Sequence, residues 1–192
     1  IGNYDGVHVG HRRIIRKVVE KAAEISGTPM LMTFFPHPHS VLKPDSYIRL
    51  ITPPSVKERL VASSGIEVMF QIPFDDHLRS IAPETFIDDI LVEKIRVAGV
   101  IVGYDFHFGK GGAGDVEMLR EFARRRGFYF DVVEAITIDG EKIGSNRIRR
   151  LIMEGDVRKA NELLDRPHII EGIVVHGVNR GKNMGFPTIN FE

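Results

Sequence analysis

The stretch that decides the fold reads Ile1-Gly2-Asn3-Tyr4-Asp5-Gly6-Val7-His8-Val9-Gly10-His11. It comes directly before residues 11–26, where apolar side chains recur at helical spacing. In a parallel α/β sheet, ligands bind where a strand turns into a helix, because the first N–H groups of the helix are free. The glycines let the backbone approach a ligand, and His8 and His11 add two imidazoles. The stretch therefore predicts a phosphate-binding turn.

Strand-like and helix-like patterns alternate along most of the chain. Apolar runs predict buried strands over 29–35, 66–72, 98–102 and 128–133, and helical patterns cover 11–26, 54–63, 83–94, 115–126, 145–155 and 156–164. This order predicts an α/β fold with a doubly wound, Rossmann-like parallel sheet. Residues 168–176 read as a strand and 177–185 are rich in glycine, which is typical of an all-β unit. We expect a first domain over 1–166 and the incomplete start of a second over 167–192.

Composition excludes several classes of protein. The chain has 26 basic and 26 acidic residues, whereas a nucleic-acid-binding protein usually has a basic excess. It has no cysteine, which excludes disulfides, thiolate zinc sites and a cysteine nucleophile. Neither a membrane-length apolar run nor a signal peptide is visible, so we expect a cytoplasmic protein without membrane or nucleic-acid partners. Because the first residue is Ile, we expect a fragment of a longer protein.

The two histidines of the first stretch suit nucleotidyl transfer. Charge builds on the α-phosphate and on the departing pyrophosphate, so catalysis needs mainly positioning and electrostatic stabilisation. Imidazoles can donate hydrogen bonds to phosphate oxygens. Two alternatives remain open: His8 and His11 are surface residues that cap a helix, or they bind zinc together with Asp5.

The first stretch resembles the G-N-F-D-G-V-H-x-G-H signature of the prokaryotic bifunctional riboflavin kinase/FMN adenylyltransferase family, also called FAD synthetase. Tyr4 stands where the family has Phe. The resemblance implies transfer of AMP from Mg-ATP to FMN, giving FAD and pyrophosphate. It also implies that the full-length parent phosphorylates riboflavin to FMN.

Two further segments resemble motifs of this family. Residues 33–38 look like its T-F-x-P-H-P segment, which implies that Phe35, Pro36 and His37 bind the flavin. Residues 103–111 look like its G-x-D/N-F-x-F-G-K segment, which implies nucleotide contacts from Gly103 and Asp105. From their spacing, Phe106 and Phe108 read as core residues and Lys110 as a solvated charge.

Residues 143–149 open a helix and resemble the family's ATP-binding I-S-S-T/S-x-I-R motif. We expect Ser145 to cap this helix, and the helix start with Arg149 to bind phosphate. Gly144 and Asn146 replace hydroxyl residues of the family pattern, so we expect reduced or retuned ATP binding. The simpler alternative is a capped helix with exposed arginines.

The last segment, residues 172–190, resembles the start of the family's riboflavin kinase barrel. Its G-F-P-T-x-N run implies that Thr188 and Asn190 bind Mg-ATP of the kinase. Because the family's catalytic glutamate lies further along, we expect this fragment not to phosphorylate riboflavin.

Together these motifs assign a role to each candidate residue. The catalytic residues are His8, His11, Asn3 and Arg149, and ATP binding is assigned to Gly2, Asp5, Gly6, Gly10, Gly103, Asp105, Ser145 and Arg147. We expect no protein ligand for the metal in the first domain, because Mg²⁺ keeps phosphate and water ligands. We expect a monomer or weak homo-oligomer. Another nucleotidyltransferase of the same superfamily, or a non-catalytic flavin- or nucleotide-binding module, remains as an alternative.

Overall fold

The structure is a computed structural model that describes residues 1–177, 181, 184–186 and 188–191, except the side chain of Phe191. Its helices are α1 (Val9–Glu24), α2 (Pro38–Leu42), α3 (Pro54–Ala62), α4 (Asp76–Ser80), α5 (Pro83–Thr85), the π-helical η1 (Phe86–Ile95), the 3₁₀ turn η2 (Lys110–Gly112), α6 (Val116–Arg126), α7 (Ser145–Met153) and α8 (Val157–Leu164). Its strands are β1 (Met30–Phe35), β2 (Val68–Pro73), β3 (Gly99–Gly103), β4 (Tyr129–Val133), β5 (Thr137–Ile138), β6 (Glu141–Lys142), β7 (Val174–Val175) and β8 (Asn190–Phe191).

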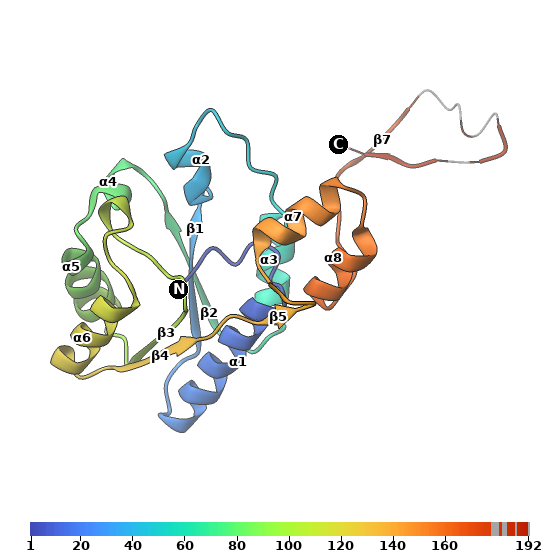
Figure 1. The fold of residues 1–192 in the computed structure, drawn as a ribbon. Coiled ribbons are helices and arrows are strands. Elements are labelled where there is room, and N and C mark those ends of the chain that lie inside the picture. The colour runs from blue at the N-terminus through green and yellow to red at the C-terminus, as the bar shows by residue number, and fades with distance from the viewer. Residues whose placement is uncertain (178–180, 182–183, 187, 192) are drawn as a thin grey trace.

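The central strands form two parallel pairs in place of the single sheet that we expected. β1 pairs with β2, and β3 pairs with β4. Ile1 and Gly2 lie between the pairs: Gly2 N donates to Met32 O of β1 at 3.0 Å, and the Ile1 ammonium donates to Ile101 O of β3 at 3.5 Å. The first motif therefore starts at the seam between the two pairs, at the centre of the fold (Figure 1).

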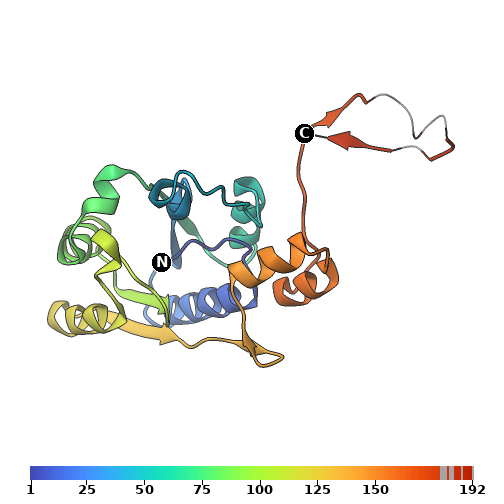
Figure 2. The same ribbon diagram turned by 45° about the horizontal axis from the view of Figure 1, so that its top comes forward.

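Helices cover both faces of the strands. Neighbouring strand residues face opposite sides, and the core divides accordingly. Leu31 and Ile101 pack with Ile15 of α1, whereas Met32 and Val102 pack with Leu91 of η1 and with α6. Figures 1 and 2 show α7 and α8 at one end of the strands and α5 and α6 at the other. The middle residues of β1 and β3 are buried, as the apolar run of β1 predicted, whereas β2 has no buried residue.

The turn before α1 has an unusual backbone. Tyr4 and Val7 have φ values of 51° and 42°, and Gly6 lies between them at 91°. Side chains other than glycine seldom adopt positive φ, and such strain persists only where the surroundings enforce it. Tyr4 and Val7 are both buried, so core packing holds this turn in shape.

The elements differ from the sequence expectations in several places. The segment after β1, expected to be irregular, includes the short helix α2, and α4 and the β5–β6 hairpin were not expected. The helix expected over 83–94 divides into α5 and a π-helical segment. The strand expected over 168–176 is limited to Val174–Val175, since nothing pairs with 168–173 in the described part of the chain.

The end of the chain forms a separate feature. β7 pairs with β8 in an antiparallel hairpin, which extends away from the rest of the molecule in both ribbon views (Figures 1 and 2). Residues 178–180, 182–183, 187 and 192 of this glycine-rich run lie outside the described residues. No described helix combines the length and the apolar character that crossing a membrane requires.

Candidate active site

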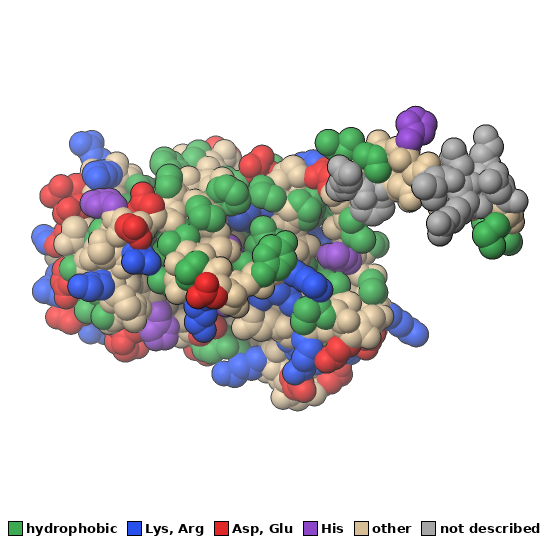
Figure 3. Space-filling model, turned by 90° about the horizontal axis from the view of Figure 1, so that it is seen from above, with side chains coloured by type: hydrophobic (Ala, Val, Ile, Leu, Met, Phe, Trp, Pro, Cys, Tyr) green, Lys and Arg blue, Asp and Glu red, His purple; other side chains and the backbone are tan. Residues whose placement is uncertain are grey.

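A cavity of about 840 Å³ lies beside the first motif, a volume typical of small-molecule sites. The helix α2, which follows β1, lies at the top of Figure 1, and Figure 3 views the molecule from that side. In that view hydrophobic side chains gather in the middle of the face, with Lys and Arg side chains beside them. The cavity brings together four of the sequence motifs; its lining includes Gly2, Asn3, His8, Gly10, His11, His37, Gly103, Asp105, Ser145 and Arg149.

His8 and His11 stand together at the wall of this cavity. Their rings stack with centroids 3.6 Å apart and planes inclined by 18°. His8 is the N-cap of α1, and its Nδ1 accepts a hydrogen bond from the backbone N–H of His11 at 3.3 Å. This bond fixes the proton of a neutral His8 on Nε2, where it can be donated to a ligand. A Cβ at Gly10 would lie 3.1 Å from the His8 ring, which explains the glycine there.

Burial keeps both imidazoles neutral at physiological pH. It lowers the pKa of His8 to about 4. Burial also lowers the pKa of His11 well below its ordinary value, and the charges of His8 and Lys57 add to the effect. His11 Nδ1 is buried without a hydrogen-bond partner among the described residues. The histidines therefore offer hydrogen bonds, and an arriving anion would favour their protonation.

The start of α7 forms another wall of the cavity. Its N-cap is Gly144, which provides no side-chain bond, so Ser145 is the first residue of the helix and not its cap as expected. The Ser145 hydroxyl instead donates to Asp5 O at 2.8 Å. The free N–H groups of a nine-residue helix remain available at this end, which is the geometry that attracts phosphate.

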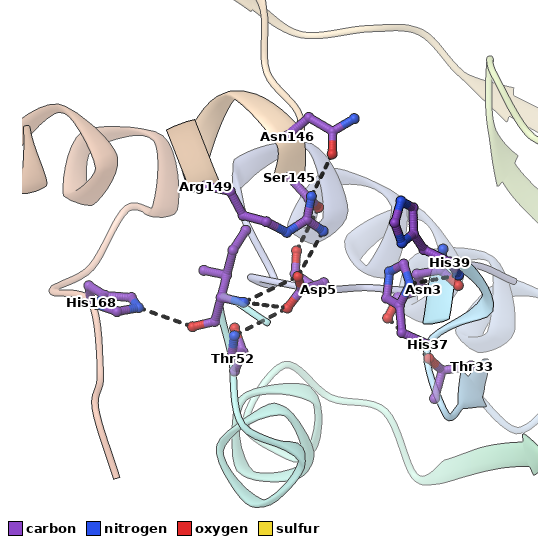
Figure 4. Close-up of polar contacts among 11 residues, drawn as sticks. Asn3, Asp5, Thr33, His37, His39, Thr52, Ser145, Asn146, Arg149 and His168 are labelled. Carbon is purple, nitrogen blue, oxygen red and sulfur yellow. Dashed lines mark hydrogen bonds and ion pairs between the residues drawn. The ribbon is translucent and has the colours of Figure 1, made fainter. Parts of the chain in front are cut away.

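Arg147 and Arg149 of α7 point in different directions, because residues two apart do not face each other on a helix. Arg149 lines the cavity and reaches the first motif, where Nη2 donates to Asp5 Oδ2 at 3.0 Å (Figure 4). Arg147, expected to bind ATP, lies against the β5–β6 hairpin: Nη1 donates to Ile138 O at 3.1 Å and Nε pairs with Glu141 at 2.9 Å. These contacts tie α7 to the hairpin, and Arg147 does not belong to the described lining of the cavity.

The expected flavin segment contributes in part. His37 lines the cavity, and burial lowers its pKa, whereas Phe35 and Pro36 lie outside the lining within the described part of the chain. Phe35 is 45% exposed because it follows Phe34 on a strand and points to the opposite side. Phe34 faces the cavity instead, with the edge of its ring packed against Phe74 at a centroid distance of 5.9 Å.

The glycine-rich segment after β3 places Gly103 and Asp105 at the cavity, with the Asp105 side chain exposed. Phe108 is buried in the core as expected, and Phe106 packs against the same core while also lining the cavity. Lys110 is exposed, as expected of a solvated loop charge. Asp5 and Gly6 of the first motif lie behind the cavity wall and are absent from its described lining.

Lys57 is a charged residue near the site that sequence reasoning missed. It is only 8% exposed, and its ammonium donates to Thr33 Oγ1 at 3.4 Å. The Thr33 hydroxyl in turn donates to Asn3 O at 3.1 Å. The charge of Lys57 helps to lower the pKa of His11 and of His37, which places it close to both. Lys57 could have been found as a lysine on the apolar face of the helix predicted over 54–63.

The kinase residues stand apart from this cavity. Thr188 and Asn190 are exposed on the C-terminal hairpin, and neither belongs to the described lining. No group of three or more metal-ligating His, Asp or Glu side chains occurs among the described residues. The zinc alternative for His8, His11 and Asp5 therefore has no ligand cluster to support it.

Comparisons with known proteins match this arrangement. A family model for FAD synthetase matches residues 1–147, and one for riboflavin kinase matches residues 164–192. The protein named "Bifunctional riboflavin kinase/FMN adenylyltransferase" from Listeria monocytogenes is 35% identical over 193 residues, covering 100% of this chain and 61% of that protein. Its namesake from Bacillus subtilis is 37% identical, covering 99% and 60%. The chain thus spans less than two thirds of these relatives.

A solved structure gives the same picture of the fold. The "Crystal Structure of Macrolide-efflux Protein from Streptococcus pneumoniae" superposes with a TM-score of 0.89 at 28% identity, over 100% of this chain and 62% of that one. The FAD synthetase match covers the two parallel strand pairs and most of the cavity wall, from the first motif to the start of α7. Because the FAD synthetase match extends over more than half of this chain, the chain belongs to the FAD synthetase family.

Proposed function

We propose that this chain transfers the AMP part of ATP to FMN, producing FAD and pyrophosphate. The observation that carries the proposal is the meeting of four motifs in one cavity: the stacked His8–His11 pair, His37, Asp105, and the uncapped start of α7 with Arg149. Hydrogen-bond donors and a guanidinium converge there from segments far apart in the sequence. Such a set suits a triphosphate better than an uncharged ligand.

The chemistry needs positioning and charge stabilisation. An oxygen of the FMN phosphate attacks the α-phosphorus of ATP, the bond from that phosphorus to the bridging oxygen breaks, and pyrophosphate leaves with the electron pair. His8 and His11 donate hydrogen bonds to the phosphate oxygens as charge develops there. Arg149 and the first N–H groups of α7 hold the departing pyrophosphate. Asn3, Gly2 and Gly10 shape the turn beneath it.

The apolar part of the cavity suits the flavin. Phe34, Phe74 and Phe106 line it, and His37 stands near the end of β1. We assign the isoalloxazine ring to this apolar wall and the FMN phosphate to His37. Asp105, beside Gly103 at the end of β3, is placed to accept hydrogen bonds from the ribose or adenine of ATP.

The metal enters as part of the Mg-ATP substrate in this proposal. Mg²⁺ prefers phosphate and water oxygens and needs few protein ligands. ATP and FMN are the small-molecule partners, and we place the enzyme in the cytoplasm as a monomer or weak homo-oligomer. We further propose that the two strand pairs are parts of one doubly wound sheet.

The C-terminal hairpin belongs, in our proposal, to a second domain that starts at residue 167. The match of residues 164–192 to riboflavin kinase and the names of the relatives support a longer protein that also phosphorylates riboflavin. Thr188 and Asn190 would then contact the Mg-ATP of the kinase within the start of a β-barrel.

Incubating the full-length protein with FMN and Mg-ATP tests the main proposal. FAD and pyrophosphate should appear in equal amounts, and His8→Ala should abolish most of this activity. His77→Ala is the matched control, because His77 is exposed on α4 and lies outside the described cavity lining. Unchanged FAD production by His8→Ala would remove the assigned role. Binding of ATP and FMN without pyrophosphate release would instead support a non-catalytic binding module.

A further inference from the structure

The Asp5 carboxylate is one of the most heavily bonded side chains near the site. It is 3% exposed and accepts backbone hydrogen bonds from Ile51 at 3.0 Å and from Thr52 at 3.1 Å, both to Oδ1. Its Oδ2 accepts from Arg149 Nη2 at 3.0 Å and from Ile51 N at 3.2 Å. Figure 4 shows Thr52 and Arg149 converging on Asp5 from two separate segments of the chain.

Three N–H donors already bond the Asp5 carboxylate. Thr52 N bonds Oδ1, Arg149 Nη2 bonds Oδ2, and the single N–H of Ile51 lies within hydrogen-bond distance of both oxygens. Asp5 also lies outside the described lining of the cavity, whereas Arg149 forms part of it. The carboxylate therefore stands behind the arginine, away from the place where phosphates would bind.

Arg149 is held from two directions. Its Nη2 bonds to Asp5, and its Nη1 donates to the Asn146 side chain one turn earlier on α7. Its Nε is buried and has no partner among the described residues. These two bonds use two of the five N–H donors of the guanidinium, and Arg149 lines the cavity. An unrestrained arginine side chain loses substantial rotamer entropy when it binds an anion. Arg149 should lose less rotamer entropy on binding an anion, because the ion pair with Asp5 already orders its side chain.

A second bond ties Asp5 to the same helix. The Ser145 hydroxyl donates to Asp5 O at 2.8 Å, so the backbone and the side chain of Asp5 both contact the first turns of α7. Asp5 therefore helps both to fix the first motif against α7 and to orient Arg149.

We propose that Asp5 is a positioning residue that acts through Arg149: from behind the cavity wall it orients the guanidinium toward the ATP phosphates. This assignment rests on the proposed adenylyl transfer and replaces the direct ATP contact expected for Asp5. It predicts that loss of the Asp5 charge weakens ATP binding more than FMN binding. Asp5 bonds Arg149 directly, whereas it acts on His37, the residue assigned to the FMN phosphate, only through its charge.

The test measures steady-state FAD formation by the full-length protein, varying Mg-ATP and FMN separately. Asp5→Asn keeps an acceptor for Ile51 and Thr52 but turns an amide toward Arg149. We expect the KM for Mg-ATP to rise about tenfold, with a much smaller change in the KM for FMN. Asp88→Asn is the matched control, since Asp88 pairs with Arg126 at 2.8 Å on an exposed surface outside the described cavity lining.

A double-mutant cycle separates positioning from general support of the fold. If Asp5 acts through Arg149, adding Asp5→Asn to Arg149→Ala should cause no further rise in the KM for Mg-ATP. Additive effects, an equal rise in both KM values, or an unchanged KM for Mg-ATP would each overturn the proposal. If Asp5→Asn fails to fold, Asp5→Glu replaces it and should show the same selective loss for ATP. If the unmutated protein makes no FAD at all, adenylyl transfer itself fails, which is a distinguishable result.

Discussion

Two regions of the molecule differ in how far the rest of the fold supports them. One is the corner where the first motif meets α7, and the other is the hairpin after Pro167. In the corner, Asp5 and His8 are buried, and bonds from Ser145 and Arg149 join it to the rest of the molecule. On the hairpin, Ile173 is 77% exposed and Phe186 is 75% exposed. Family models match both the first motif with the start of α7 and the hairpin, but the two regions differ in how much of the described fold packs around them.

The largest contrast should appear in activity. We predict that His11→Ala lowers kcat for FAD formation about 10²–10³-fold, the usual cost of removing one donor to a developing charge. His176→Ala, which alters an exposed histidine next to the hairpin strand β7, should leave FAD formation unchanged. Steady-state kinetics of the full-length protein measure both. Equal activity in the two variants would show that the corner is not the reacting centre.

Stability should follow the same division. Ile148 of α7 is 0% exposed, and Ile148→Ala should reduce the free energy of unfolding by about 2–5 kcal/mol. Ile189 is 75% exposed, and Ile189→Ala should change it by less than about 0.5 kcal/mol in this 192-residue chain. Urea titrations followed by circular dichroism give both values. A similar cost for the two substitutions would mean that the hairpin packs on the core after all.

The buried His8 should make the corner sensitive to acid. The unfolded chain binds a proton at His8 near its ordinary pKa of 6.5, but the folded chain binds it only near pH 4. With respect to His8, the free energy of unfolding therefore has its full value above pH 6.5, and it decreases as the pH falls toward 4. From pH 6.5 to pH 5 His8 alone should cost about 2 kcal/mol of unfolding free energy.

Urea titrations at several pH values can isolate this contribution. His8→Asn should flatten the dependence over that range, whereas the exposed His176→Asn should leave it as in the unmutated chain. A slope that persists in His8→Asn would assign the acid sensitivity to other groups.

The smallest expected effect comes from two glycines. Gly144 has an extended backbone with φ −166°, and a side chain there would meet open space. Gly144→Ser should therefore cap α7 and raise the free energy of unfolding by a few tenths of a kcal/mol. Gly185 of the hairpin segment has φ +81°, so Gly185→Ser should slightly destabilise that region. Urea titrations should show a rise in the free energy of unfolding for Gly144→Ser and a fall for Gly185→Ser. A fall for Gly144→Ser would contradict an uncapped start of α7.

The sequence predicted the elements that have strong periodicity. Residues 11–26 and 29–35 carried clear helical and strand patterns, and they correspond to α1 and β1 with boundary shifts of two residues or fewer at each end. The segment 168–173 was expected to be a strand from its apolar residues alone. It lacks a partner among the described residues, and extended segments need one to form a ladder.

The motif residues were easier to find than their partners. His8 and His11 were identified from their spacing, and Arg149 from a predicted helix start and the family motif. The bonds of Asp5 to Ile51 and Thr52 were not predicted, because backbone N–H groups leave no signal in a sequence. The opposite directions of Phe34 and Phe35 follow from strand alternation. Which of the two faces the cavity depends on how the sheet is covered, and only the fold decides that.

The most direct test of the central claim follows the α-phosphorus of ATP. Full-length protein is incubated with FMN and Mg-ATP labelled with ³²P at the α-position, and the products are separated. We expect the label to appear in FAD while the released pyrophosphate is unlabelled, and His8→Ala and His11→Ala to slow the transfer strongly. Label that remains in ATP, although ATP and FMN both bind, would contradict it.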